Sequence, residues 1–141
     1  MGAGKGTPRG VKRAALGKGR FTGCRKHPWL PEYLLARPGC VMEYKPTWDA
    51  TLCRLGGKIF ALYLRDGKGT PMLNLKCDPY LALDYRDAFP GVLPGWHMNK
   101  LHWNSLLLEG DTPDEIVREL VDISYGLVRA ALPKKVRENI G

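Results

Sequence analysis

The chain has 141 residues, of which 44% are hydrophobic and 26% are charged, and its formal net charge is +8 at pH 7. This length and composition are typical of one globular domain with a single hydrophobic core. No apolar run reaches the roughly 18 residues that a membrane-spanning helix needs, and the N-terminus lacks the apolar segment of a secretory signal. We therefore expect a soluble, cytoplasmic protein with no membrane partner.

The positive charge is concentrated at the N-terminus. Residues 1–27 contain eight lysines and arginines, seven glycines and no acid, whereas residues 28–141 hold 14 basic and 14 acidic side chains. We expect a flexible basic tail over 1–27 and one domain over 28–141. Such a tail can hold phosphates by releasing counterions, but a merely solubilising extension would have the same composition, so both interpretations stay open.

The first half of the domain is predicted as a helix followed by three strands. Residues 30–37 form the helix, which a Pro-Gly pair ends. Residues 51–55 and 58–64 are predicted as strands joined by a two-glycine hairpin turn. A second glycine-containing turn follows, and residues 72–76 form the third strand.

The second half is predicted as a helix, two strands and a long final helix. Asp78-Pro79 begins the first helix, which runs to about Ala88, and the two short strands lie within residues 95–109. Thr112-Pro113-Asp114-Glu115 resembles a capping box and predicts a helix over 113–131. Its apolar stripe, with Ile123 in the middle, consists of Ile116, Val117, Leu120, Val121, Ile123, Leu127, Val128 and Ala131.

These elements define the fold class. The expected order is helix, three strands, helix, two strands, helix, with short connections throughout. Such an order forms a two-layer α+β domain, in which one five-stranded antiparallel sheet carries helices on one face. The opposite face is then left without helices.

The sequence offers no strong signal for metal binding or catalysis. Cys24, Cys40, Cys53 and Cys77 include no Cys-x-x-Cys pair, so we expect reduced thiols in the core. His97 and His102 are too few for a zinc site. A trio of Cys77, Asp78 and His97 has no catalytic motif beside it. We expect no cofactor, no metal, no small-molecule substrate and no enzymatic activity.

The densest polar and aromatic segment is Pro94–Asn104, within which Gly95–Asn104 reads Gly-x-His-Met-Asn-Lys-x-His-Trp-Asn. Together with Asn74–Pro79 and Asp122–Tyr125, this segment resembles the MmcQ/YjbR family over residues 29–137. The resemblance implies the same order of helices and strands as above. It also implies a role in binding DNA through hairpin wings.

Lysines beside such turns would contact phosphates without reading the bases. Trp96 and Trp103 would either stack on unpaired bases or pack in the core. The alternative function is a small protein-interaction adaptor that uses the sheet face without helices, if that face is apolar. The candidate nucleic-acid-binding residues are Lys58, Lys68, Lys76, His97, Asn99, Lys100, His102 and Trp103.

Overall fold

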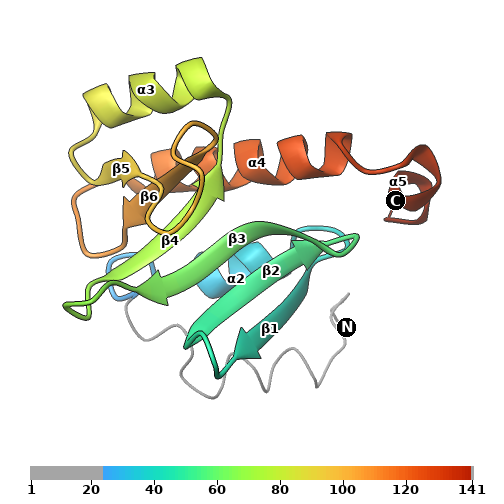
Figure 1. Cartoon of the computed structure of the whole chain (residues 1–141), viewed down its shortest axis with the longest axis horizontal. Coiled ribbons are helices and arrows are strands. Elements are labelled where there is room, and N and C mark those ends of the chain that lie inside the picture. Colours follow the sequence, from blue (N-terminus) through green and yellow to red (C-terminus); the bar gives the residue numbers. More distant parts are fainter. Residues whose placement is uncertain (1–23, 141) are drawn as a thin grey trace.

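The computed structural model describes residues 24–140, in which six antiparallel strands form one sheet and helices pack against it (Figure 1). The predicted α+β class and single antiparallel sheet are confirmed, but the sheet has six strands where five were predicted. In chain order the elements are α2 (Leu30–Leu35), β1 (Val41–Lys45), β2 (Ala50–Leu55), β3 (Lys58–Arg65), β4 (Pro71–Lys76), α3 (Pro79–Ala88), β5 (Val92–Pro94), β6 (Trp103–Leu107), α4 (Asp114–Ala130) and α5 (Lys134–Ile140).

The sheet has the strand order β1-β2-β3-β4-β6-β5, and the prediction was wrong for its two edge strands, β1 and β5. Val41–Lys45 was interpreted as a connection, and the strand expected within residues 95–109 lies earlier, at Val92–Pro94. An edge strand pairs on one side only, and β1 buries Met42 fully while Val41 and Glu43 stay exposed. Its apolar signal is therefore weak.

A bulge in β3 is tied to α4 by one serine. The register shifts between Cys53 and Arg54 of β2, which pair with Ala61 and Ile59, so Phe60 is the extra residue of β3. The hydroxyl of Ser124 in α4 donates to the Phe60 carbonyl oxygen at 2.5 Å and accepts from the Lys76 amide at 2.8 Å. Ser124 therefore fixes the position of α4 over β3 and β4.

The buried face of α4 differs from the apolar stripe that was predicted from the sequence. The fully buried side chains of the helix are Val117, Leu120, Val121, Ser124 and Val128. Ile123, predicted to lie in the middle of the stripe, is only half-buried, and Leu127 is 36% exposed. The buried face therefore follows Ser124, which the apolar pattern alone does not reveal.

The predicted capping box of α4 is also wrong. The helix begins at Asp114, and Pro113, in an extended conformation, is the N-cap residue without a side-chain cap bond. The Pro113 carbonyl oxygen accepts from the amides of Ile116 and Val117, both at 3.0 Å. The Thr112 hydroxyl is buried and has no hydrogen-bond partner within residues 24–140.

Residues 24–27, assigned to the tail from the sequence, pack against the start of α4. Arg25 and Lys26 form ion pairs with Glu109 and Asp111, at 3.4 and 3.1 Å. The buried His27 lies 2.6 Å from an Asp114 carboxylate oxygen, and this hydrogen bond lowers the pKa of Asp114. The folded part therefore includes Cys24 to His27, and the tail interpretation of residues 1–23 lies outside the described residues.

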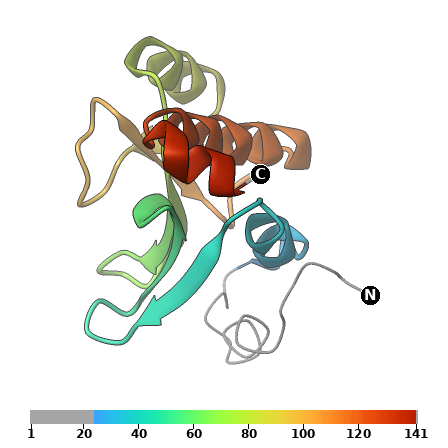
Figure 2. The ribbon, with the colours of Figure 1, turned by 90° about the vertical axis from the view of Figure 1, so that its right-hand side faces the viewer.

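Side chains pack into a cluster on each face of the sheet. α2 and α4 contribute to the main core on one face, while the loop between β5 and β6, residues 95–102, lies on the other (Figure 2). Trp96 and Met98 of this loop pack against apolar strand residues, among which Leu52, Leu62 and Met72 are at most 6% exposed. Leu52, Leu62 and Met72 are therefore buried on the face without helices.

All four cysteines are buried with free thiols, which agrees with their expected place in the core. Burial raises the pKa of Cys24 to about 12 and also raises the pKa of Cys77. We expect slow modification of the native protein by a disulfide reagent at pH 8, and reaction of four thiols after denaturation. Fewer than four thiols in denatured protein, or stoichiometric zinc on elemental analysis, would contradict this prediction.

Within residues 24–140, no helix combines the length and the apolar character needed to cross a bilayer. In the same part of the chain, no three His, Cys, Asp or Glu side chains gather as metal ligands would.

Candidate nucleic-acid interface

The 95–102 loop begins in a buried ring of hydrogen bonds with β4 and β6. Asn74 is fully buried, and its amide nitrogen donates to the Trp96 carbonyl oxygen at 2.9 Å. The Ser105 hydroxyl donates to the Asn74 side-chain oxygen at 2.5 Å and accepts from the Trp96 amide at 2.8 Å. Because each polar group in the ring has a partner, the ring fixes the start of the loop on the sheet.

Gly95 allows the loop to approach β6 closely. Its amide donates to the Trp103 carbonyl oxygen at 2.9 Å. A Cβ atom at Gly95 would lie 2.8 Å from the Trp103 Cβ and 2.9 Å from that carbonyl oxygen, closer than these atoms can pack. The glycine that opens the sequence motif is therefore required for packing.

The second half of the loop is held by two side chains that were predicted from the sequence to contact nucleic acid. The Asn99 side-chain oxygen accepts from the amides of Leu101 and His102, at 2.9 and 3.2 Å. The Lys100 ammonium donates to the Gly95 carbonyl oxygen at 3.0 Å. Both side chains thus have structural roles in the loop, although both residues are exposed.

Arg86 connects this loop to α3. Its guanidinium donates to the Asn104 side-chain oxygen at 2.7 Å and to the Lys100 carbonyl oxygen at 2.5 Å. Asn104 in turn donates to the Ala82 carbonyl oxygen, at 3.4 Å. Arg86 was not among the residues predicted from the sequence, because its partners are 14 and 18 positions away in the chain.

Six of the eight predicted residues lie together at one end of the sheet, and we call them the loop cluster. Lys76, the last residue of β4, pairs with Trp103 at the start of β6, and the Cys77 amide donates to the His102 carbonyl oxygen at 2.8 Å. His97, Lys100 and His102 are exposed, whereas Trp103 is half-buried. The loop cluster consists of Lys76, His97, Asn99, Lys100, His102 and Trp103.

Of the two remaining lysines, Lys58 is the first residue of β3 and Lys68 lies in the turn that follows this strand. Because β3 and β4 are antiparallel, Lys58 at the start of β3 lies at the same end of the sheet as Lys76 and the rest of the loop cluster. Lys68 is in the turn after β3, which is an eight-residue strand of roughly 25 Å. The two hairpin turns that carry Lys58 and Lys68 therefore lie at opposite ends of the sheet.

The turn that holds Lys68 also carries a fixed negative charge. The Asp66 carboxylate accepts from the amides of Thr70 and Lys68, at 2.9 and 2.8 Å, and these hydrogen bonds lower the pKa of Asp66. The Arg65 guanidinium donates to the Gly69 carbonyl oxygen of the same turn at 2.7 Å, so one acidic and two basic side chains meet there.

Charge separates between the two layers of the domain. The six strands carry five basic residues and one acid, Glu43, which gives a net charge of +4. α3 and α4 together carry six acids and three arginines, which gives a net charge of −3. The strands of the formally neutral domain are therefore electropositive and α3 and α4 are acidic, while α5, with three basic residues and one acid, is positive as well. The basic strand residues are Lys45, Arg54, Lys58, Arg65 and Lys76.

An exposed apolar patch, which was not predicted from the sequence, lies beside the loop cluster. In α3, Ala82 is fully buried and Tyr85 packs half-buried against the core, whereas Leu81 and Leu83 are exposed. Tyr80, Leu83 and Leu101 are 81%, 54% and 61% exposed. The signal in the sequence is weak, because a ten-residue helix with few apolar residues does not show which of them faces the sheet.

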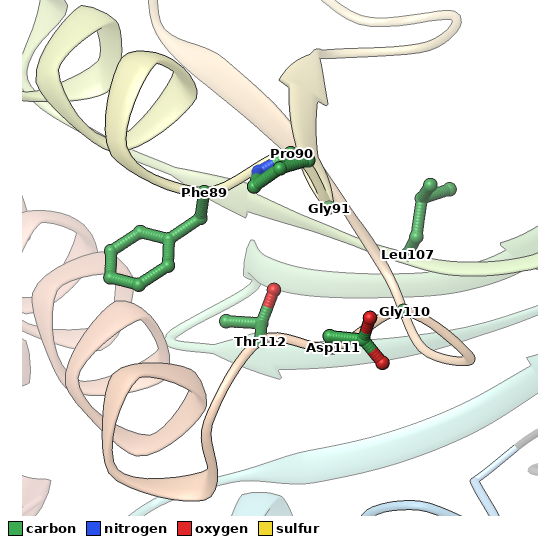
Figure 3. A pocket seen from close by; sticks show the side chains of 7 residues that line it. All are labelled: Phe89, Pro90, Gly91, Leu107, Gly110, Asp111 and Thr112. Atoms are coloured by element: carbon green, nitrogen blue, oxygen red, sulfur yellow. The ribbon is translucent and has the colours of Figure 1, made fainter.

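At the far end of β6, away from the loop cluster, lies a hollow with a volume of about 230 Å³ (Figure 3). The Thr112 hydroxyl points toward Pro90 and Gly91 there, and Phe89 lies at one side. None of the candidate residues lines this pocket. It is lined by Phe89, Pro90, Gly91, Leu107, Gly110, Asp111 and Thr112.

Comparison with known sequences relates this chain to one family. The YjbR family profile matches residues 35–127. The uncharacterized protein YjbR of Escherichia coli K12 is 33% identical over 109 residues, which cover 77% of this chain and 92% of that protein. The uncharacterized protein YbdF of Escherichia coli O157:H7 is 36% identical over 97 residues, which cover 69% of this chain and 77% of that protein.

Solved structures show the same arrangement of elements. The crystal structure of the Deinococcus radiodurans protein DR2400, a DUF419 domain, superposes with a TM-score of 0.71 at 28% identity and covers 79% of this chain and 85% of that one. A crystal structure of a Pseudomonas syringae protein superposes with a TM-score of 0.60 at 24% identity, with 69% of this chain and 93% of that one covered. The second likeness supports the fold alone.

Proposed function

The chain belongs to the YjbR family, and from this premise we propose that it is a nucleic-acid-binding module which contacts phosphates through Lys58 and the loop cluster. The observation that carries the proposal is the separation of charge between the basic strands and the acidic helices α3 and α4. An electropositive layer on a neutral domain attracts a polyanion to one side and orients it. Lysine contacts to phosphate give affinity without base preference.

The proposed module has no catalytic role. Cys77 is the one candidate nucleophile beside a histidine-containing loop, but its side chain is 2% exposed and burial raises its pKa. A buried, protonated thiol is a poor nucleophile. The exposed histidines of the loop are better suited to hydrogen bonding with phosphate or base.

A matched pair of double variants tests the proposal. We expect Lys58→Ala/Lys76→Ala to weaken binding to a short labelled duplex and to reduce the slope of log K against log salt by about 2, because each lost phosphate contact removes about 0.9. Lys134→Ala/Lys135→Ala removes the same charge from α5 and should leave the slope unchanged. Fluorescence anisotropy across a salt series measures both slopes.

Equal losses in the two double variants would contradict the proposal, since net charge and not position would then explain binding. The contribution of the basic N-terminal segment is separated by removing residues 1–23. The deletion must stop before Cys24, because Arg25, Lys26 and His27 contact residues 109–114. Absence of binding by the full chain at low salt would also overturn the proposal.

The second candidate function is a protein-interaction adaptor. Leu52, Leu62 and Met72 are buried on the sheet face without helices, so that face offers these side chains to no partner. The observation that favours an adaptor is the exposed patch of Tyr80, Leu83 and Leu101. An apolar patch of this kind is suited to a protein surface as well as to a base.

A further inference from the structure

A pocket of about 310 Å³ lies between the first turns of α3 and the second half of the 95–102 loop. Its three large apolar side chains, those of Tyr80, Leu83 and Leu101, are each more than half exposed. One exposed apolar side chain needs no explanation, but three around one hollow indicate an interaction site. The pocket is lined by Pro79, Tyr80, Leu83, Arg86, Lys100 and Leu101.

Both walls of this pocket are fixed by hydrogen bonds. On the helix side, the Asp78 carboxylate accepts from the amides of Tyr80 and Leu81, at 3.1 and 3.2 Å. On the loop side, Asn99 holds the amide of Leu101 at 2.9 Å. Arg86 connects the walls through the Lys100 carbonyl oxygen, so the hollow is preformed and a ligand need not order it.

The pocket is apolar inside and positive at its rim. Its two charged lining residues, Arg86 and Lys100, are both basic, and no carboxylate lines it. Within residues 24–140, both cations donate to backbone or amide oxygens and neither forms an ion pair, so their charge is not neutralised. Asp78, which precedes Pro79 in the chain, does not line the pocket, and its carboxylate accepts from the amides of Tyr80 and Leu81 in α3.

These features suit a ligand in which an apolar group is attached to negative charge. We propose that the pocket holds one unpaired nucleobase of a single strand, with the base against Tyr80 and Leu101 and the neighbouring phosphates beside Lys100 and Lys76. Bases stack on aromatic side chains with little dependence on sequence. This inference rests on the proposed nucleic-acid binding and adds that the bound strand is unpaired at the pocket.

Three labelled ligands of equal length separate base from phosphate: an oligothymidine strand, the same strand with abasic sites, and a duplex. We expect Tyr80→Ala to weaken binding of oligothymidine by at least about fivefold, or about 1 kcal/mol, and to leave the abasic strand and the duplex almost unchanged. Tyr80→Phe should bind oligothymidine as the full-length wild type does. Fluorescence anisotropy at fixed salt gives all three affinities.

A matched aliphatic pair tests the pocket further. Leu101→Ala should weaken oligothymidine binding, whereas Leu93→Ala, which removes an exposed leucine from β5 outside the pocket, should not. Since Tyr80 is 81% exposed, its variants should keep their thermal stability, so lost binding is not lost folding.

The outcomes distinguish this inference from the proposed function. If Tyr80→Ala leaves oligothymidine binding unchanged while Lys58→Ala/Lys76→Ala reduces it, phosphate binding stands and the base pocket is wrong. Equal affinity of the wild type for the abasic and the intact strand has the same meaning. If the pocket takes an apolar peptide instead, nucleic-acid binding will not respond to Tyr80→Ala, and that result overturns the inference.

Discussion

Replacing Leu120 with alanine should lower the free energy of unfolding by about 2–5 kcal/mol, whereas Leu127→Ala should lower it by roughly 1 kcal/mol or less. Both leucines lie in α4, so the two changes share the same loss of side-chain atoms and the same change in helix propensity. They differ in burial, because Leu120 is 3% exposed and Leu127 is 36% exposed. Urea unfolding followed by far-UV circular dichroism measures the difference.

The same experiment distinguishes the observed buried face from the predicted one. The apolar stripe predicted from the sequence includes Leu120 and Leu127 together, and would give both variants a similar cost. Similar costs would therefore mean that α4 is rotated away from the position that Ser124 fixes on β3 and β4. An unchanged m-value in both variants is the control for two-state unfolding.

Much of the fold was predictable because local signals and tertiary structure agree. Gly56 and Gly57 both have positive φ, which the hairpin between β2 and β3 requires. Asp78 is the N-cap residue of α3 and Pro79 is its first residue, and the helix ends at Ala88 as predicted. Asx capping, proline at the first turn and glycine turns depend on a few neighbouring residues, so a sequence alone contains them.

The elements that were missed depend on contacts far along the chain. α5 is a seven-residue helix without buried residues, and β5 has three residues, so neither leaves a periodic pattern. Pro113 was expected within α4, but the helix begins one residue later, where Asp114 contacts His27, 87 positions away. No local rule contains that partner.

In the candidate site, too, the local features were predictable from the sequence and the contacts between distant segments were not. The motif from Gly95 to Asn104 forms the 95–102 loop and the first two residues of β6, at one end of the sheet. Sequence reasoning did not show that Asn99 and Lys100 use their polar groups to hold the loop. The hollow with Tyr80 was missed because its walls come from α3 and the loop, which meet only in the folded chain.

Asn74, buried in β4, should matter more to the loop than Asn99, which is exposed within it. Asn74→Ala should lower the free energy of unfolding by about 2–5 kcal/mol, because it leaves a buried hydroxyl proton without an acceptor and a carbonyl oxygen without its donor, and opens a small cavity. These groups are the Ser105 hydroxyl and the Trp96 carbonyl oxygen. Asn99→Ala should cost only about 0.5–1.5 kcal/mol, since the two amides it releases lie in an exposed segment that water reaches.

Urea unfolding gives both free energies, and the contribution of Trp96, one of four tryptophans, to the native fluorescence reports the loop. Trp96 is partly buried against β2, β3 and β4 residues, and the ring of hydrogen bonds with Asn74 and Ser105 holds its backbone. Asn74→Ala should therefore shift native emission toward that of exposed indole even before unfolding, while Asn99→Ala should not. If both variants instead keep native emission and lose equally little stability, the ring does not hold the loop, and the positions of His97, Lys100 and His102 must be fixed by Gly95 and Arg86 alone.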